Sequence, residues 1–306
     1  MKKFLLLTIL IILIPVLIIG VNNKEEIIKK LKFGFYSNKT VKVKRNKTNE
    51  VITIPLEEYV IGVVAGEMPA SFNIEALKAQ AVASRTYVLK RQNNNNNYDV
   101  VDSVSNQVYI DYEQMKEKWK NNYEENLKKI KKAVLETKGE VLLYENNIID
   151  AMFFSTSNGY TENSGDVFSS NLPYLKSVES TWDKNESPVF FSTKELTKTE
   201  FLFNLGLDIK NEIIIKDIEK TNTGRVKNIT INDTMFKSSK IKEAFNLKST
   251  SFNIELKEEK VIFSVNGYGH GVGMSQYGAN GMAKEGNDYK NILTHYYNGC
   301  EIKKLY

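Results

Sequence analysis

The order of apolar and polar residues along the chain predicts short strands followed by amphipathic helices. Residues 40–54 alternate apolar and polar side chains around a polar centre, which is typical of two short strands joined by a turn. The next segment has a helical period, in which Pro55 suits the first position and Gly66 the position just past the end. Its apolar face consists of Leu56, Tyr59, Val60, Val63 and Val64. The pattern therefore places Glu67 at the C-terminal end of a short helix.

An alanine-rich helix is predicted to follow, with Asn73 as its N-cap. Its apolar face contains Ile74, Leu77, Ala81 and Val88, and Ala76, Ala79 and Ala83 permit close approach of a neighbour. A charged helix is expected over residues 113–137. Residues 140–144 and 148–154 form a predicted hairpin about a turn at 145–147, and this hairpin leads into a hydroxyl-rich loop. Loops held by a rigid hairpin are favoured places for binding residues.

Residues 192–256 have the pattern of a separate lobe, with a helix near 194–205, strands within 212–233, a second helix and a final strand pair. The segment 266–283 is glycine-rich at first and then helix-like. The predicted fold class is therefore α+β, with one domain over residues 39–306 that carries an inserted smaller lobe.

An apolar run precedes this domain. Residues 4–21 are 18 residues without a charge, which is the lower edge of what spans a bilayer. No small-residue cleavage pattern follows Val21. We therefore expect an uncleaved signal anchor, a transmembrane helix over residues 1–23, and a linker over 24–38. The protein is then expected to be a single-pass cell-membrane protein with its domain outside the cytoplasm.

The composition limits which partners and which kinds of site the chain is expected to have. The formal net charge of +5 suits an anionic lipid or polymer surface, and because the charges are scattered and no nucleic-acid motif is present, we expect no nucleic acid partner. One cysteine excludes an intramolecular disulfide. His270 and His295 are the two histidines, and no orienting acid accompanies His270 and Ser275 in a triad pattern. A zinc site from His270, His295 and Cys300 is chemically possible, but its spacing is not a recognised one.

Two further features have alternative explanations. Gly267, Gly269, Gly271 and Gly273 imitate a phosphate-binding loop, but a tight turn that brings His270 close to a ligand fits better, because the strand, loop and helix order is not found. Glu67 is either a solvated carboxylate at a helix end or an acid whose pKa is raised by the apolar Met68, Pro69 and Phe72.

Three blocks carry a resemblance to a known family. They are "GEMPASFNIEALKAQAVASRTYVL" at 66–89, "FFSTSNGYTENSGDVF" at 153–168 with "LPYLKSVES" at 172–180, and "GYGHGVGMSQYGANGMA" at 267–283. In this order they resemble the stage II sporulation protein D family (SpoIID), peptidoglycan lytic transglycosylases of endospore-forming bacteria. The resemblance covers almost the whole chain after the apolar run. It implies membrane-anchored cleavage of the bond between N-acetylmuramic acid and N-acetylglucosamine, with a 1,6-anhydro product, during forespore engulfment.

The resemblance also implies roles for individual residues. The glutamate of the "GEMP" block is the family's catalytic acid, and it corresponds to Glu67. The implied glycan contacts are Tyr174, Lys176, Ser155, Thr156, Ser157, Tyr160, His270, Ser275, Gln276 and Arg85, with Gln80 as a further candidate. Three of these residues also have a structural explanation. Tyr174 could belong to the core, Lys176 could be solvated, and Arg85 could form a structural ion pair. Many relatives have a histidine where this chain has Phe154, and some add Cys or His residues that hold a zinc ion. Because those ligands are missing here, we expect no metal and no cofactor.

The implied substrate is a peptidoglycan glycan strand without its stem peptides. The implied partners are the amidase stage II sporulation protein P (SpoIIP) and the membrane protein stage II sporulation protein M (SpoIIM). Since related domains activate amidases, a non-catalytic, glycan-binding amidase activator is the alternative function.

Overall fold

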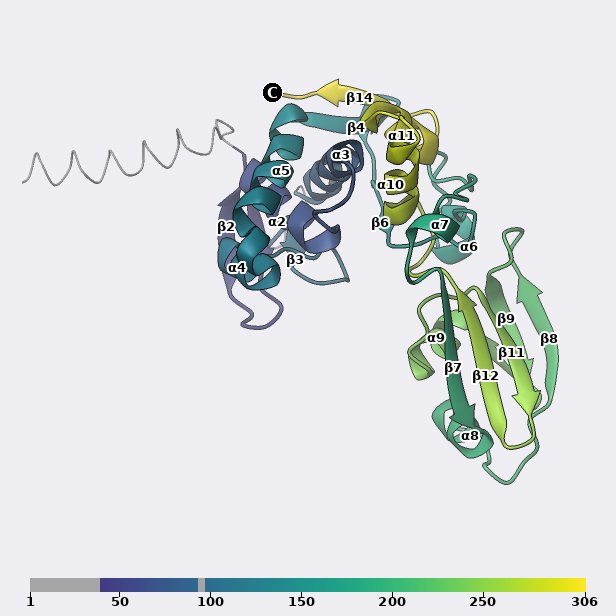
Figure 1. The fold of residues 1–306 in the computed structure, drawn as a ribbon. Coiled ribbons are helices and arrows are strands. Elements are labelled where there is room, and N and C mark those ends of the chain that lie inside the picture. The colour runs from purple at the N-terminus through teal and green to yellow at the C-terminus, as the bar shows by residue number, and fades with distance from the viewer. Residues whose placement is uncertain (1–38, 93–96) are drawn as a thin grey trace, which may run out of the picture.

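The computed structural model describes residues 39–92 and 97–306, and its main body is built around one central helix (Figure 1). This helix, α3 (Ile74–Arg91), packs against α2 (Leu56–Glu67) and α5 (Tyr123–Glu136). It also contacts α10 (Gln276–Lys284) and α11 (Tyr289–Tyr296). Its alanines are fully buried, which permits this close packing. The predicted N-cap is confirmed, because the Asn73 side chain accepts a hydrogen bond from the Glu75 amide at 3.0 Å.

Short sheets surround these helices. β1 (Thr40–Lys44) and β2 (Val51–Pro55) pair antiparallel, which confirms the predicted strand pair, and β3 (Val100–Val101) pairs parallel with β1. A second sheet has the order β14-β4-β5, formed by Glu301–Lys304, Glu140–Tyr144 and Asn147–Ile148.

The predicted strand over 148–154 is wrong in its second half. The hairpin ends at Ile148, and β6 (Phe153–Phe154) instead pairs parallel with β13 (Met274–Ser275). A long-range partner therefore overrides the local hairpin. This pairing places the start of the hydroxyl-rich loop beside the end of the glycine-rich loop.

The predicted charged helix is interrupted. It consists of α4 (Tyr112–Trp119) and α5, separated at Lys120, whose φ of 47° lies in the left-handed region that ends a helix. Two single-turn helices, α6 (Ser164–Val167) and α7 (Asp183–Glu186), lie in the segment that follows β6.

The elongated part of Figure 1 is formed by two three-stranded sheets and two helices. One sheet has the order β11-β12-β7 (Phe252–Lys257, Lys260–Asn266, Phe191–Thr197), and the other has the order β10-β9-β8 (Thr234–Lys237, Val226–Ile231, Ile215–Lys220). The helices are α8 (Lys198–Leu205) and α9 (Ser238–Ala244).

This lobe has a hydrophobic cluster of its own, which extends from Phe201 to Val265, whereas a second cluster fills the body. The helix predicted from residue 194 begins later, at Lys198, because Thr197 and Glu200 form a capping box there and the preceding residues form β7. The division into domains at residues 39, 192 and 256 stays a prediction.

The α+β architecture is present, but the predicted transmembrane helix has to be corrected, and with it the expected single-pass location at the cell membrane. Within residues 39–92 and 97–306 no helix is long and apolar enough to cross a bilayer. The longest helix of this part, α3, has 18 residues and includes Glu75, Lys78 and Arg85, whereas a span needs about 20 mostly apolar residues. The predicted segment, residues 1–23, lies outside the described residues.

Candidate functional site

Glu67 is the last residue of α2, which ends two residues later than predicted. Gly66 belongs to the helix instead of following it, and its missing side chain has a different use. A Cβ at Gly66 would lie 2.3 Å from the carbonyl oxygen of Val108, so only glycine permits this segment to approach the helix. The close approach places the backbone of Val108 beside the Glu67 carboxyl group.

The Glu67 carboxyl group is partly exposed and has two hydrogen-bond donors. Its Oε1 accepts from the Val108 backbone amide at 2.6 Å, and its Oε2 accepts from the Gln276 side-chain amide at 3.2 Å. The next residue, Met68, and nearby Phe72 are buried, so apolar surface borders the group on the side of the core. The donors come from segments 41 and 209 residues away in sequence.

Burial raises the pKa of Glu67 above its ordinary value. The Val108 and Gln276 hydrogen bonds and the positive charge of Lys118 oppose this shift, but burial outweighs them. The C-terminal end of a helix carries partial negative charge, which further disfavours a carboxylate. The result is a carboxyl group that holds a proton more readily than a solvated glutamate and can still be ionised, which suits a group that donates and then accepts a proton.

A chain of buried polar side chains lies behind Gln276. The Gln276 amide nitrogen lies 3.5 Å from Oε1 of Gln80, and Gln80 donates to the Ser84 hydroxyl at 2.9 Å. Gln107 donates to the Ser84 carbonyl at 3.4 Å and accepts from the Tyr59 hydroxyl at 2.9 Å. Since Gln80 presents its oxygen, Gln276 is oriented with its NH₂ group toward Glu67. Gln80 is itself fully buried.

Ser157 and Ser275 surround a buried acid that the sequence analysis missed. The Asp183 carboxylate accepts from the hydroxyls of Ser157 at 2.9 Å, Ser180 at 2.7 Å and Ser275 at 2.6 Å. Burial raises the pKa of Asp183, which these hydrogen bonds oppose. The hydroxyls of Ser157 and Ser275 therefore point inward, and Ser275 also caps α10, the helix that begins with Gln276.

The other residues of the hydroxyl-rich loop differ in exposure. Thr156 is fully buried and its hydroxyl bonds to that of Ser187 at 2.8 Å, whereas Ser155 is partly exposed. Tyr160 is 47% exposed and available to a ligand.

Tyr174 is buried in the core, whereas the Lys176 side chain lies at the surface. Tyr174 is 8% exposed, accepts from the Asp150 amide at 3.1 Å and packs in the body core. Lys176 donates to the Asn171 side chain at 3.1 Å and borders a polar pocket of about 390 Å³ with Asn163 and Asp166. Lys176 thus reaches a recess that a polar ligand can enter.

His270 makes two hydrogen bonds within the chain. Its Nδ1 accepts from the Val272 amide at 3.1 Å, so its Nε2 carries the proton that bonds to the Phe153 carbonyl at 3.1 Å. Burial lowers the pKa of His270 to about 4, and the rings of Phe154 and Phe168 lie against it. The imidazole is therefore neutral, and both its nitrogens are used by the loop.

Arg85 is fully buried in an ion pair with Glu57, which is the alternative that the sequence left open. Its Nε and Nη2 donate to the two Glu57 oxygens at 2.9 and 2.6 Å, and its Nη1 donates to the Glu140 carbonyl at 3.1 Å. The structure thus brings Gln276 to Glu67 and keeps Arg85 inside the body.

A metal site is not formed by the candidate trio. His295 bonds through Nε2 to the Glu179 carbonyl at 2.8 Å, and Cys300 is a buried free thiol. In the part of the chain that the structure describes, no three His, Cys, Asp or Glu residues gather as metal ligands would. The expectation of no metal stays a prediction.

Comparisons with known proteins relate the chain to one family. The profile of the family described as "Stage II sporulation protein" matches residues 44–144. Stage II sporulation protein D of Bacillus subtilis (strain 168) is 43% identical over 272 residues, which cover 87% of this chain and 79% of that protein. The protein of the same name from Bacillus amyloliquefaciens has the same identity and coverage. The chain belongs to the stage II sporulation protein D family.

Another relative has a different name. The amidase enhancer of Bacillus subtilis (strain 168) is 33% identical over 297 residues, which cover 79% of this chain and 40% of the enhancer. The stage II sporulation protein D family resemblance that the sequence blocks suggested is thus confirmed. Its profile match includes Glu67, Val108 and Lys118, which are three of the groups that form the site.

Proposed function

We propose that this chain acts in sporulation, at forespore engulfment, as a lytic transglycosylase of peptidoglycan glycan strands, with Glu67 as its catalytic acid and base. Membership of the family supports the role in sporulation. The observation that carries the enzymatic part is the state of Glu67: a partly exposed carboxyl group whose pKa is raised by burial, while two N–H donors stand ready for its ionised form.

The proposed reaction needs one carboxyl group. Protonated Glu67 donates its proton to the glycosidic oxygen as the bond from C1 of N-acetylmuramic acid breaks. The 6-hydroxyl of the same sugar then attacks C1, closes the 1,6-anhydro ring and gives its proton to the Glu67 carboxylate. No water is consumed, and Glu67 ends in its starting state. The Val108 amide and Gln276 stabilise the carboxylate between the two steps.

The preferred substrate in this proposal is a strand without stem peptides, because the bond next to N-acetylmuramic acid is then open to the site. An amidase must act first, and stage II sporulation protein P is the proposed supplier. Stage II sporulation protein M stays a prediction from the resemblance.

The experiment is digestion of denuded glycan strands by wild type and by Glu67→Gln. Glutamine keeps the shape of the side chain but cannot donate the proton, so strand cleavage should fall by at least ~10²-fold while binding to the strands persists. Glu113→Gln is the matched control, because this exposed carboxylate pairs with Lys116 on α4 and should leave cleavage unchanged. Equal cleavage by Glu67→Gln and wild type would exclude Glu67 as the acid.

The second candidate function is activation of an amidase without glycan cleavage. The similarity to the amidase enhancer over 79% of this chain favours it. The same proteins, added to an amidase and intact peptidoglycan, separate the two functions through the release of stem peptides. If wild type and Glu67→Gln both increase this release and neither shortens the strands, the chain is an activator.

A further inference from the structure

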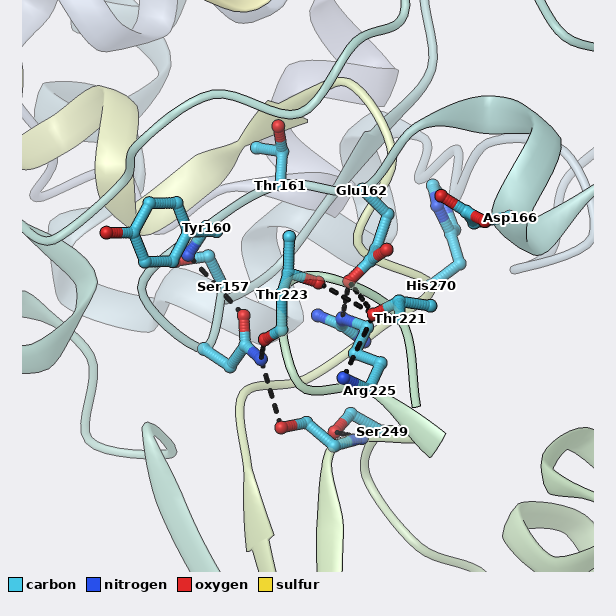
Figure 2. A network of polar contacts seen from close by, with 12 residues as sticks. Ser157, Tyr160, Thr161, Glu162, Asp166, Thr221, Thr223, Arg225, Ser249 and His270 are labelled. Carbon is cyan, nitrogen blue, oxygen red and sulfur yellow. Dashed lines mark hydrogen bonds and ion pairs between the residues drawn. The ribbon is translucent and has the colours of Figure 1, made fainter. Parts of the chain in front are cut away.

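A buried ion pair joins the hydroxyl-rich loop of the body to the turn between β8 and β9 of the lobe (Figure 2). Nε of Arg225 lies 3.6 Å from Oε1 of Glu162, and the Thr221 hydroxyl donates to the same oxygen at 3.2 Å. The Glu162 and Arg225 side chains are at most 1% exposed. Charged groups therefore meet where the lobe joins the body, out of contact with solvent.

This pair is less complete than the buried pair of Arg85 and Glu57. Within the described residues, Glu162 Oε2 and Arg225 Nε and Nη2 are buried without a hydrogen-bond partner. Charge-assisted hydrogen bonds are about 2.7–2.9 Å long, so the 3.6 Å separation leaves much of the attraction unused. Under-satisfied buried charges are costly, and maximal stability is therefore a poor explanation for their presence.

The pair holds the glycine-rich loop from two sides. Nη1 of Arg225 donates to the Gly269 carbonyl at 3.1 Å, and the Glu162 backbone amide donates to the Gly271 carbonyl at 2.7 Å. Gly271 has a φ of 89° and lies against the guanidinium group, so a Cβ at this position would be 2.7 Å from Cζ of Arg225. The loop continues through β13 into Gln276, which bonds to Glu67.

We propose that Glu162 and Arg225 form a latch through which the inserted lobe positions the glycine-rich loop and, with it, Gln276 against Glu67. The consequence for cleavage rests on the proposed function. Both residues are positioning residues, because they act on Glu67 through the loop.

The latch also responds to pH. Burial raises the pKa of Glu162 to about 7, which Arg225 and Thr221 oppose, and burial lowers the pKa of Arg225 to about 10. Since the buried carboxyl group binds its proton more tightly than a solvated one, protonation favours the closed latch. Below pH 7 Glu162 is therefore uncharged in the closed latch, and Arg225 keeps its bond to Gly269. As the pH rises through 7, the buried carboxylate becomes charged, which destabilises the closed latch and loosens it. The charged or titratable groups that face the pair are Asp166, Lys227, Asp183 and His270.

Hydrogen exchange of the whole chain tests the latch without reference to activity. The readout is the protection of peptides that span residues 267–276, corrected for the intrinsic rate at each pH. In wild type, we expect protection to fall by about tenfold or more between pH 5.5 and 8, given the raised pKa. Glu162→Gln mimics the protonated carboxyl group and should abolish this dependence. Arg225→Met removes the bond to Gly269 and should expose the loop at every pH.

Lys216→Met is the control, because it breaks an exposed pair with Asp233 inside the lobe and should leave residues 267–276 protected. Wild-type protection in both Glu162→Gln and Arg225→Met, with the same pH dependence, would overturn the proposal. If Arg225→Met also exposes the lobe core, the latch is tested instead by the protection of residues 267–276 in Arg225→Lys and by the difference in pH dependence between wild type and Glu162→Gln. Glycan-strand cleavage by wild type is measured in parallel. If the exchange data support the latch but wild type does not cleave glycan, the proposed function is refuted and the latch is not.

Discussion

The two ends of α2 each carry a glutamate, and the two carboxyl groups have opposite environments. Glu57, in the first turn, is fully buried and accepts hydrogen bonds from Nε and Nη2 of Arg85. It also accepts from the Gly139 amide at 3.3 Å and from the Tyr306 hydroxyl at 2.5 Å. Glu67, at the last residue, is partly exposed and has two neutral donors. The helix dipole favours an anion at the first position and opposes it at the second.

This difference separates a structural acid from a reactive one on the same helix. Glu57 has a counter-ion and four hydrogen-bond donors, which suits a structural role. Glu67 has partial compensation and access to solvent, so its proton can move. The difference is due to their partners: Glu57 is paired with Arg85 of α3, whereas Glu67 accepts hydrogen bonds from Val108, in the segment after β3, and from Gln276 of α10.

The largest effect on stability is expected at Glu57. Glu57→Gln leaves the buried Arg85 without a counter-charge and should lower the free energy of unfolding by about 3–5 kcal/mol in a urea titration. The double variant Glu57→Leu with Arg85→Met removes both charges and should recover part of this loss. A loss below about 1 kcal/mol in Glu57→Gln would show that the pair contributes little.

A smaller effect is expected on the pH dependence of cleavage. Cleavage needs protonated Glu67, so its rate should fall as the pH rises through the Glu67 pKa. Gln276 and the charge of Lys118 hold that pKa down, and both Gln276→Leu and Lys118→Met should move the alkaline limb of the pH–rate profile to higher pH. Lys116→Met, on the same helix but paired with exposed Glu113, should leave the limb in place. A shift to lower pH in either test variant contradicts the assigned electrostatics.

The smallest effect is expected on the stability of Glu67→Gln. Because the pKa of Glu67 is raised on folding, wild-type stability should decline as the pH rises through that pKa, and the variant should lack this decline. At neutral pH the free energy of unfolding should change by no more than about 1 kcal/mol. A loss as large as that of Glu57→Gln would make Glu67 a structural acid too.

Local sequence patterns were sufficient to predict that Glu67 lies at a helix end but not which residues contact its carboxyl group. The helical period of α2 and the Asn73 cap are local features, so the end of α2 was predicted to within two residues. The apolar neighbours Met68 and Phe72 are also close in sequence, and of the two alternatives that the sequence left open for Glu67, a solvated carboxylate or an acid of raised pKa, the structure supports the second.

The missed features depend on contacts that no local pattern contains. Val108 and Lys118 reach Glu67 because Gly66 lets a distant segment approach, although Gly66 looked like a helix terminator. Asp183 lies in a single-turn helix, and the hydroxyls that surround it come from three segments. The choice between a glycan contact and an ion pair for Arg85 likewise depended on Glu57, 28 residues earlier.

The most direct test of the central claim, that Glu67 alone serves as acid and base in a reaction without water, is the mass of the new strand ends. Denuded glycan is digested by wild-type protein in water enriched in oxygen-18, and the fragments are examined by mass spectrometry. We expect 1,6-anhydro ends without the heavy isotope. Reducing ends that carry oxygen-18 would show hydrolysis, which requires an activated water that Glu67 alone does not supply, and would exclude this mechanism.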